Sequence, residues 1–83
     1  MTLDKLALNQ PSKVLKVEGQ DILVQRLMAI GFLPGTEIRV VQAAPFGDPI
    51  MIELNGWRIS LRCKDAACIF VEPDKSNHLS NGI

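Results

Sequence analysis

The chain has 83 residues, roughly half the length of an average domain, so we expect a single compact unit. Nine basic and nine acidic side chains leave the formal net charge at zero, which excludes an overall positive field for holding nucleic acid or an acidic membrane. Leu, Ile, Val and Phe make up about a third of the residues, enough for a small core.

The N-terminal elements follow from hydrophobic periodicity. Alternation over residues 12–18 predicts a strand with Leu15 and Val17 on its buried side. Apolar residues then recur at helical spacing and predict a helix from about 20 to 30. Gly31 is suited to the left-handed conformation that ends a helix, and Phe32 to folding back on the last turn.

The rest of the chain reads as strands joined by turns. Residues 33–36, Leu-Pro-Gly-Thr, predict a type II turn, and Asn55-Gly56 predicts a type I′ hairpin turn. Alternation predicts strands over residues 36–43, 50–54 and 57–62, with Trp57 on the inner face of the last of these three. The loop at 44–49, Ala-Pro-Phe-Gly-Asp-Pro, places an apolar Phe46 at its tip.

The order of elements gives the fold class. A short helical turn at 63–67 and a last strand through Ile69 and Val71 complete the set. We predict a mostly β protein: a small, partly open barrel of about five strands, with one α-helix inserted between strands 1 and 2. Residues 1–73 would form this single domain, and residues 74–83 a disordered C-terminal tail.

No arrangement of residues points to catalysis. The only histidine, His78, falls in the expected tail, so no nucleophile has a base held beside it. Cys63 and Cys68 lack the spacing and further ligands of a zinc site. We interpret them as two reduced thiols, with a redox pair or thiolate metal site as the alternative. No glycine-rich phosphate loop is present. We expect no enzymatic activity, cofactor or metal.

The compartment and the partners follow from similar exclusions. Two cysteines are too few for a disulfide framework, the charged N-terminus does not resemble a signal peptide, and the longest apolar stretch, 27–33, is far below the about 20 residues of a membrane span. We expect a cytoplasmic protein without direct membrane insertion. Basic residues on the outer sheet face lack interleaved aromatics, so a charge-paired solvated face is expected, with protein binding as the alternative and no nucleic-acid binding.

Several short segments stand out together: Arg-Leu-Met at 26–28, Gly-Phe-Leu-Pro-Gly at 31–35, the loop at 44–49, Ile-Ser-Leu-Arg at 59–62, and Ala66 with Ile69. In this combination they resemble the FeoA family, small cytosolic proteins of bacterial ferrous iron uptake. The resemblance covers about residues 14–72. It implies an SH3-like barrel without enzymatic activity that acts with FeoB, a membrane transporter whose cytosolic part is a GTPase domain. The same barrel resembles the C-terminal domain of DtxR-type repressors, so a metal-responsive regulatory module is the alternative.

We therefore expect the chain to dock on the cytosolic GTPase-containing part of FeoB and to modulate or assemble it. A docking protein of this kind needs exposed apolar and charged groups. The candidate partner-binding residues are Arg26, Met28, Phe32, Phe46, Asp48, Met51 and Arg62. Arg26 or Arg62 acting as an arginine finger on the GTPase is a bolder variant. Weak self-association is left open.

Overall fold

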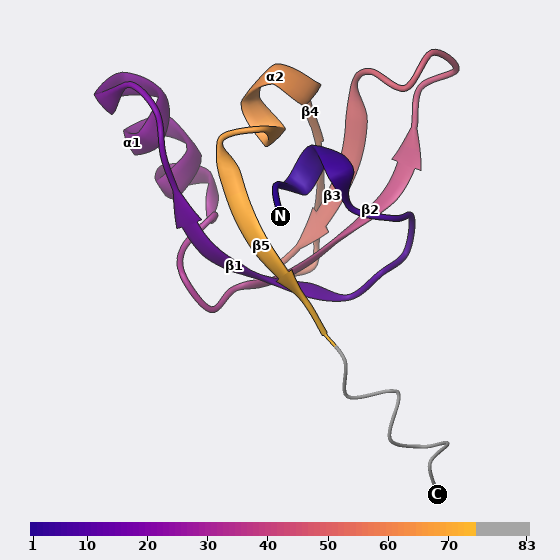
Figure 1. Ribbon diagram of the computed structural model, residues 1–83, viewed down its shortest axis with the longest axis horizontal. Coiled ribbons are helices and arrows are strands. Elements are labelled where there is room, and N and C mark those ends of the chain that lie inside the picture. The colour runs from indigo at the N-terminus through magenta and orange to yellow at the C-terminus, as the bar shows by residue number, and fades with distance from the viewer. Residues whose placement is uncertain (75–83) are drawn as a thin grey trace, which may run out of the picture.

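One bent antiparallel sheet organises the molecule. The computed structural model describes residues 1–74, and five strands pair in the order β4-β3-β2-β1-β5 (Figure 1). Their bounds are β1 Ser12–Val17, β2 Glu37–Ala43, β3 Ile50–Leu54, β4 Trp57–Leu61 and β5 Ile69–Pro73. Among the described residues the edge strands β4 and β5 do not pair with each other, so the sheet is not closed. The predicted five-stranded, partly open architecture is confirmed.

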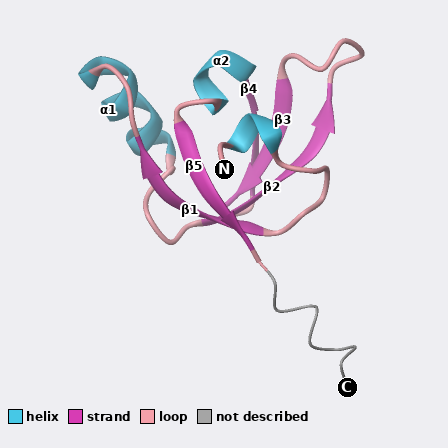
Figure 2. Ribbon diagram, in the orientation of Figure 1, coloured by secondary structure: helices cyan, strands magenta, loops and turns pink. Residues whose placement is uncertain are grey.

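Residues 1–74 also form three helical segments, which accompany the sheet (Figure 2). They are the 3₁₀ helix η1 Leu3–Lys5, the helix α1 Asp21–Ile30 and the short helix α2 Cys63–Ala66. α1 joins β1 to β2, as predicted, and lies at one side of the sheet (Figure 1). η1 and α2 contact each other, and η1 also contacts β5, so these two short helices cover part of the concave side.

The end of α1 is built as its sequence indicates. Gly31, with φ +132°, donates its backbone N–H to the carbonyl of Met28, and Phe32 donates to the carbonyl of Leu27. These two bonds form the Schellman motif, which satisfies carbonyls at the end of the helix. The motif turns Phe32 inward, where its side chain is completely buried beside Leu27 in the core.

Both predicted turns are confirmed. The N–H of Thr36 bonds to the carbonyl of Leu33, with Gly35 at φ +90°, the geometry of a type II turn. Asn55 and Gly56 both have positive φ, +50° and +82°, as a type I′ turn requires. They join β3 to β4 without an irregularity in the register.

Two predictions of burial are wrong, each for a local reason. Leu15 is 48% exposed because the β1–β5 register shifts between Val14 and Lys16, and this bulge buries Val14 instead. Trp57 is 72% exposed. It begins β4, an edge strand, so no further strand covers it and alternation alone does not bury its side chain.

The N-terminal ten residues add to the core although no periodicity predicts it. Leu3 and Leu6 are buried. Backbone bonds hold the segment at both ends: the N–H of Val71 donates to the carbonyl of Met1, and that of Asn9 donates to the carbonyl of Val40. The segment therefore covers the outer edge of β5 and reaches β2. The predicted C-terminal tail, apart from Asp74, lies outside the described residues.

Candidate functional site: a docking surface at one end

A loop and a short helix are tied together at one end of the molecule. The carboxylate of Asp48 accepts a hydrogen bond from the backbone N–H of Cys63 at 3.0 Å. The thiol of Cys63 donates to the carbonyl of Gly47 at 3.2 Å. These bonds join the loop at 44–49 to the start of α2. We call the surface formed by residues 44–49 and 62–66 the apical end.

Phe46 is the most exposed large apolar side chain of the apical end. It is 99% exposed. Its loop is nevertheless ordered by backbone bonds, since the N–H of Gly47 donates to Ala44 at 2.7 Å and that of Ala44 donates to Pro49 at 3.0 Å. A loop already fixed in shape loses little conformational entropy on binding. An aromatic ring presented in this way has the character of an anchor for a partner's pocket.

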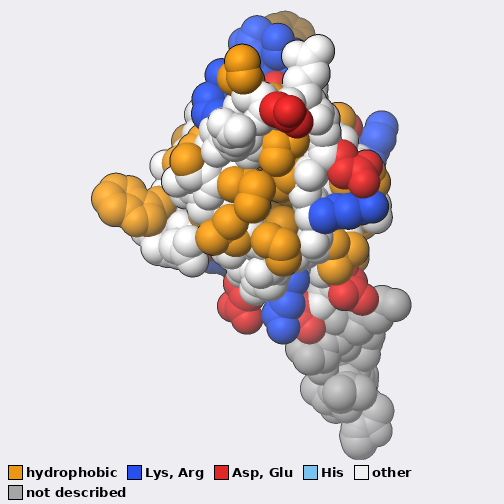
Figure 3. All heavy atoms as spheres, turned by 90° about the vertical axis from the view of Figure 1, so that its left-hand side faces the viewer, with side chains coloured by type: hydrophobic (Ala, Val, Ile, Leu, Met, Phe, Trp, Pro, Cys, Tyr) orange, Lys and Arg blue, Asp and Glu red, His pale blue; other side chains and the backbone are white. Residues whose placement is uncertain are grey.

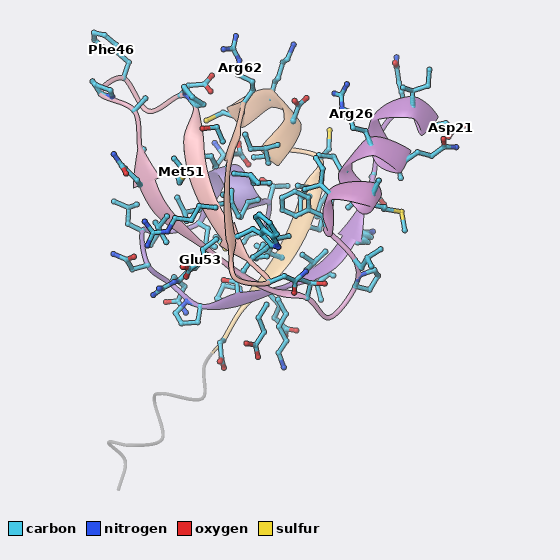
Figure 4. All side chains as sticks on the ribbon, turned by 180° about the vertical axis from the view of Figure 1, so that it is seen from behind. Asp21, Arg26, Phe46, Met51, Glu53 and Arg62 are labelled. Carbon is cyan, nitrogen blue, oxygen red and sulfur yellow. The ribbon has the colours of Figure 1, made fainter. Side chains whose placement is uncertain are left out.

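Two arginines point toward the same end of the molecule as this aromatic side chain (Figure 4). Arg62 immediately precedes α2, and Arg26 projects from α1 toward the same end of the molecule (Figure 4). Neither arginine forms an ion pair with another residue in the range 1–74. Burial raises the pKa of the Cys63 thiol, and the Asp48 carboxylate raises it further, so the thiol stays protonated near neutral pH. The apical end thus offers the apolar tip of Phe46 and the guanidinium group of Arg62, but no thiolate.

Of the remaining candidates, Met51 lies near the apical end, whereas Met28 and Phe32 do not join it. Met51 is half-buried on β3 and helps to line a shallow hollow of about 150 Å³ at the base of the loop. Met28 is 40% exposed, but it is two residues from Arg26, so the two side chains point about 200° apart around the helix. Phe32 is fully buried, and its assignment to a binding surface is wrong.

A second apolar surface was not predicted. α1 has a single buried residue, Leu27, and leaves Ile22 78% and Ile30 43% exposed. Figure 3 shows hydrophobic side chains gathered at the centre of the face over α1, with charged groups around them. The sequence does carry a signal for this surface, because the segment 22–30 has more apolar residues than one side of a helix can bury.

The far end of the sheet carries paired charges. The carboxylate of Glu53 bonds to Arg39 at 2.8 Å and lies 3.6 Å from Arg58. The hydrogen bond and charge of Arg39 lower the pKa of Glu53, and Arg58 adds to the effect. These groups confirm the cross-strand pairing expected for the outer face. Glu53 and Arg39 also border an open cavity of about 620 Å³ between the β3–β4 turn and the start of β1.

Across residues 1–74, no three His, Cys, Asp or Glu side chains come together as ligands for a metal ion. No helix within the same range has both the length and the apolar character to cross a membrane.

Comparison with known sequences identifies a family and one fused relative. The FeoA domain family matches residues 1–73. The Fe(2+) transport protein A/Fe(2+) transporter FeoB fusion protein of Porphyromonas gingivalis is 37% identical over 81 residues, a match that covers 98% of this chain and 10% of that protein. The chain therefore spans about a tenth of the length of this relative.

Solved structures give the same result for the fold. Iron(II) transport protein A from Clostridium thermocellum is 38% identical with a TM-score of 0.83, covering 88% of this chain and 45% of that one. A zinc complex of Stenotrophomonas maltophilia FeoA, described as a procaryotic SH3 domain protein, is 32% identical with a TM-score of 0.77, covering 87% and 89%. The predicted SH3-like fold is confirmed. The manganese regulator SloR, 19% identical with a TM-score of 0.76 over 89% of this chain and 34% of that one, shares the fold alone.

Proposed function

The chain belongs to the FeoA family of ferrous iron transport, and from this premise we propose that it is a non-enzymatic accessory protein that docks on a FeoB-type transporter. The apical end would contact the cytosolic, GTPase-containing part of the transporter. In this role the protein works in the cytoplasm, at the inner face of the membrane.

The fused relative is the observation that carries this proposal. In the Porphyromonas gingivalis protein, a segment similar to nearly the whole of this chain shares one polypeptide with a FeoB transporter. Fusion holds two modules at a high effective concentration, which favours an interaction between them. That association needs a contact surface on the FeoA module, and the apical end offers one, with Phe46 exposed on a loop that is hydrogen-bonded to Cys63, the residue after Arg62.

Docking would act on the conformational equilibrium of the transporter. A bound protein shifts an equilibrium only by its difference in affinity for the two states, commonly about 1–3 kcal/mol of coupling. The ordered loop at 44–49 suits this task because a rigid anchor distinguishes two shapes of a partner better than a flexible one. Arg62 could add charge stabilisation at the GTPase, as the arginine-finger variant states.

Binding to the detergent-solubilised FeoB-type transporter of the same organism tests the proposal. Wild-type protein should bind, and Phe46→Ala should weaken binding at least about tenfold, in the range expected for a buried aromatic anchor. Leu8→Ala is the matched control, since Leu8 is 56% exposed but lies outside the apical end. Equal affinity of wild type and Phe46→Ala would exclude docking through this surface.

GTP turnover by the transporter separates the two forms of the mechanism. A change in turnover that is lost in Arg62→Ala and only partly restored in Arg62→Lys supports a guanidinium acting on the nucleotide. Measurable binding with unchanged turnover leaves the accessory role without a finger. The metal-responsive module would instead show a rise in melting temperature with ferrous iron or zinc that disappears when Cys63 and Cys68 are both changed to Ser.

A further inference from the structure

One edge strand of the sheet, β5, is covered by another segment, whereas the other edge strand, β4, is not covered by any described residue. The outer edge of β5 is covered, because Val71 bonds to Met1 and Thr2 forms a bridge with Phe70. The outer edge of β4 has no such cover. Among the described residues, no backbone hydrogen bond outside the β3–β4 ladder involves residues 57–61. β4 lies at the back of the molecule in Figure 1 and faces the viewer in Figure 4.

The register shows which groups of β4 face outward. Leu54 and Trp57 flank the two-residue turn, so they form a hydrogen-bonded pair. Pairs alternate along an antiparallel ladder, and therefore Ile59 and Leu61 also bond to β3, whereas Arg58 and Ser60 direct their N–H and C=O groups away from it. Both residues are exposed. The free edge thus presents a backbone donor and acceptor at each of two alternate positions.

The side chains beside this edge differ between its two faces. Trp57, Ile59 and Leu61 lie on one face, and Trp57 leaves most of its indole exposed. Arg58, Ser60 and Arg62 continue along the other face. The Nε of Arg58 lies 3.6 Å from the carboxylate of Glu53. Arg62 forms no ion pair with any residue of the described part. One face is apolar and the other is basic.

We propose that the free edge of β4 binds an extended acidic segment by β-strand addition. The backbone of the added strand pairs with Arg58 and Ser60, and its side chains alternate. Apolar side chains cover Trp57 and Ile59, and acidic side chains face Arg58 and Arg62. A second copy of this chain fits less well, because pairing two β4 edges would gather both sets of arginines on one face.

This inference deepens the proposed function, because we assign the acidic segment to the FeoB-type transporter. Only that assignment rests on the proposed function. The recognition itself depends only on the edge. A short synthetic peptide of alternating Val and Glu, blocked at both ends, is therefore a suitable probe, with a Val and Lys peptide as its charge-reversed control. Trp57 is the only tryptophan in the chain, so its fluorescence reports directly on cover of the edge.

The expected results are specific. The Glu peptide should shift the Trp57 emission to shorter wavelength and bind at least about tenfold more tightly than the Lys peptide. The amide protons of Arg58 and Ser60 should exchange quickly in the free protein and become protected in the complex. Equal binding of the two peptides, or binding without protection of these amides, would overturn the proposal.

A backbone substitution tests the hydrogen bonds themselves. Ser60→Pro removes an outward N–H while leaving the bonds to β3 in place, and an edge strand accepts proline. It should weaken binding of the Glu peptide at least about tenfold, whereas Ser60→Ala should not. If Ser60→Pro fails to fold, a Glu peptide N-methylated on alternate residues removes the other bonds of the ladder, those from the peptide N–H groups to the carbonyls of Arg58 and Ser60, and should lose affinity on the wild-type protein. Unchanged affinity of Ser60→Pro for the Glu peptide, or of the wild-type protein for the N-methylated peptide, contradicts strand addition.

The transporter-binding assay distinguishes docking through the apical end from strand addition at the β4 edge. Binding that depends on Phe46 but not on Ser60 would leave docking through the apical end intact and remove the β4 edge. Binding of the Glu peptide without any binding of the transporter would leave the edge site intact and remove the proposed function.

Discussion

The carboxylate of Asp48 accepts the backbone N–H of Cys63 at 3.0 Å, across a separation of 15 residues. This N–H is the first of α2, where no partner exists within the helix. The preceding residue, Arg62, makes no side-chain cap bond, so the loop supplies the cap that the helix itself lacks. The exposed Phe46 and the helix after Arg62 are therefore fixed relative to each other, which a docking surface built from both requires.

The same contact predicts the reactivity of Cys63. Burial raises the pKa of this thiol, and the negative charge and hydrogen bond of Asp48 raise it further. Only the thiolate is nucleophilic, so alkylation by iodoacetamide at pH 8 should be slow. Asp48→Asn removes the charge, and the rate at Cys63 should increase. The measurement uses Cys68→Ser protein so that a single thiol reacts. A rate that is unchanged or lower would contradict the effect assigned to Asp48.

Two phenylalanines of opposite exposure give a matched pair for stability. Phe32 is fully buried in the core and Phe46 is 99% exposed. Phe32→Ala should lower the free energy of unfolding by about 3–5 kcal/mol, enough to unfold much of so small a domain. Phe46→Ala should change it by less than about 0.5 kcal/mol. Urea unfolding followed by circular dichroism measures both, and a large loss in Phe46→Ala would mean that its ring supports the fold.

Local chemistry explains which parts of the fold could be predicted. The turns at Leu33–Thr36 and Asn55–Gly56 depend on residues that adopt a required φ, so the sequence alone locates them. Phe46 stands out for a similar reason, as an apolar residue within a loop of prolines and glycines. Its exposure was predicted on this basis and is confirmed.

Other features depend on contacts that the sequence does not reveal. Leu15 is exposed because β1 bulges against β5, and Trp57 because β4 is an edge, and neither follows from alternation. Leu3 is buried although the N-terminal segment to which it belongs shows no hydrophobic periodicity. The bond between Asp48 and Cys63 joins residues from two different connections, so only the fold brings them together.

The ion pairs of Glu53 predict how stability depends on pH. Arg39, followed by Arg58, lowers the pKa of Glu53 in the folded protein. A lowered pKa stabilises the folded state above the ordinary value of 4.5, and this stabilisation is lost as the pH falls through the folded value. The stability difference between wild type and Glu53→Gln should therefore be present at pH 7 and shrink at pH 3.

Salt and a neighbouring carboxylate provide the controls for that measurement. Because Arg58 is exposed and Glu53 and Arg39 are only partly buried, added salt should reduce the difference at pH 7. Glu37 has no ion pair with another residue of the described range, so Glu37→Gln should show no comparable dependence. Urea midpoints at the two pH values decide the matter, and a difference of equal size at both would contradict the assigned role of Arg39.

Substitution of two glycines, Gly31 and Gly35, distinguishes the cost of backbone strain from the cost of close packing. Gly31 and Gly35 have φ of +132° and +90°, which an L side chain rarely adopts. A Cβ added at Gly31 would lie 3.2 Å from the side chain of Leu54, whereas one at Gly35 would meet nothing within 4 Å. Gly35→Ala should therefore cost about 1–2 kcal/mol from backbone strain alone. Gly31→Ala should cost more, because the end of α1 must also move away from the β3–β4 turn. Thermal unfolding should show a lower melting temperature for Gly31→Ala than for Gly35→Ala. The two should differ by about 4–8 °C for each kcal/mol by which the loss of unfolding free energy is larger in Gly31→Ala. The reverse order would mean that α1 is not held against Leu54.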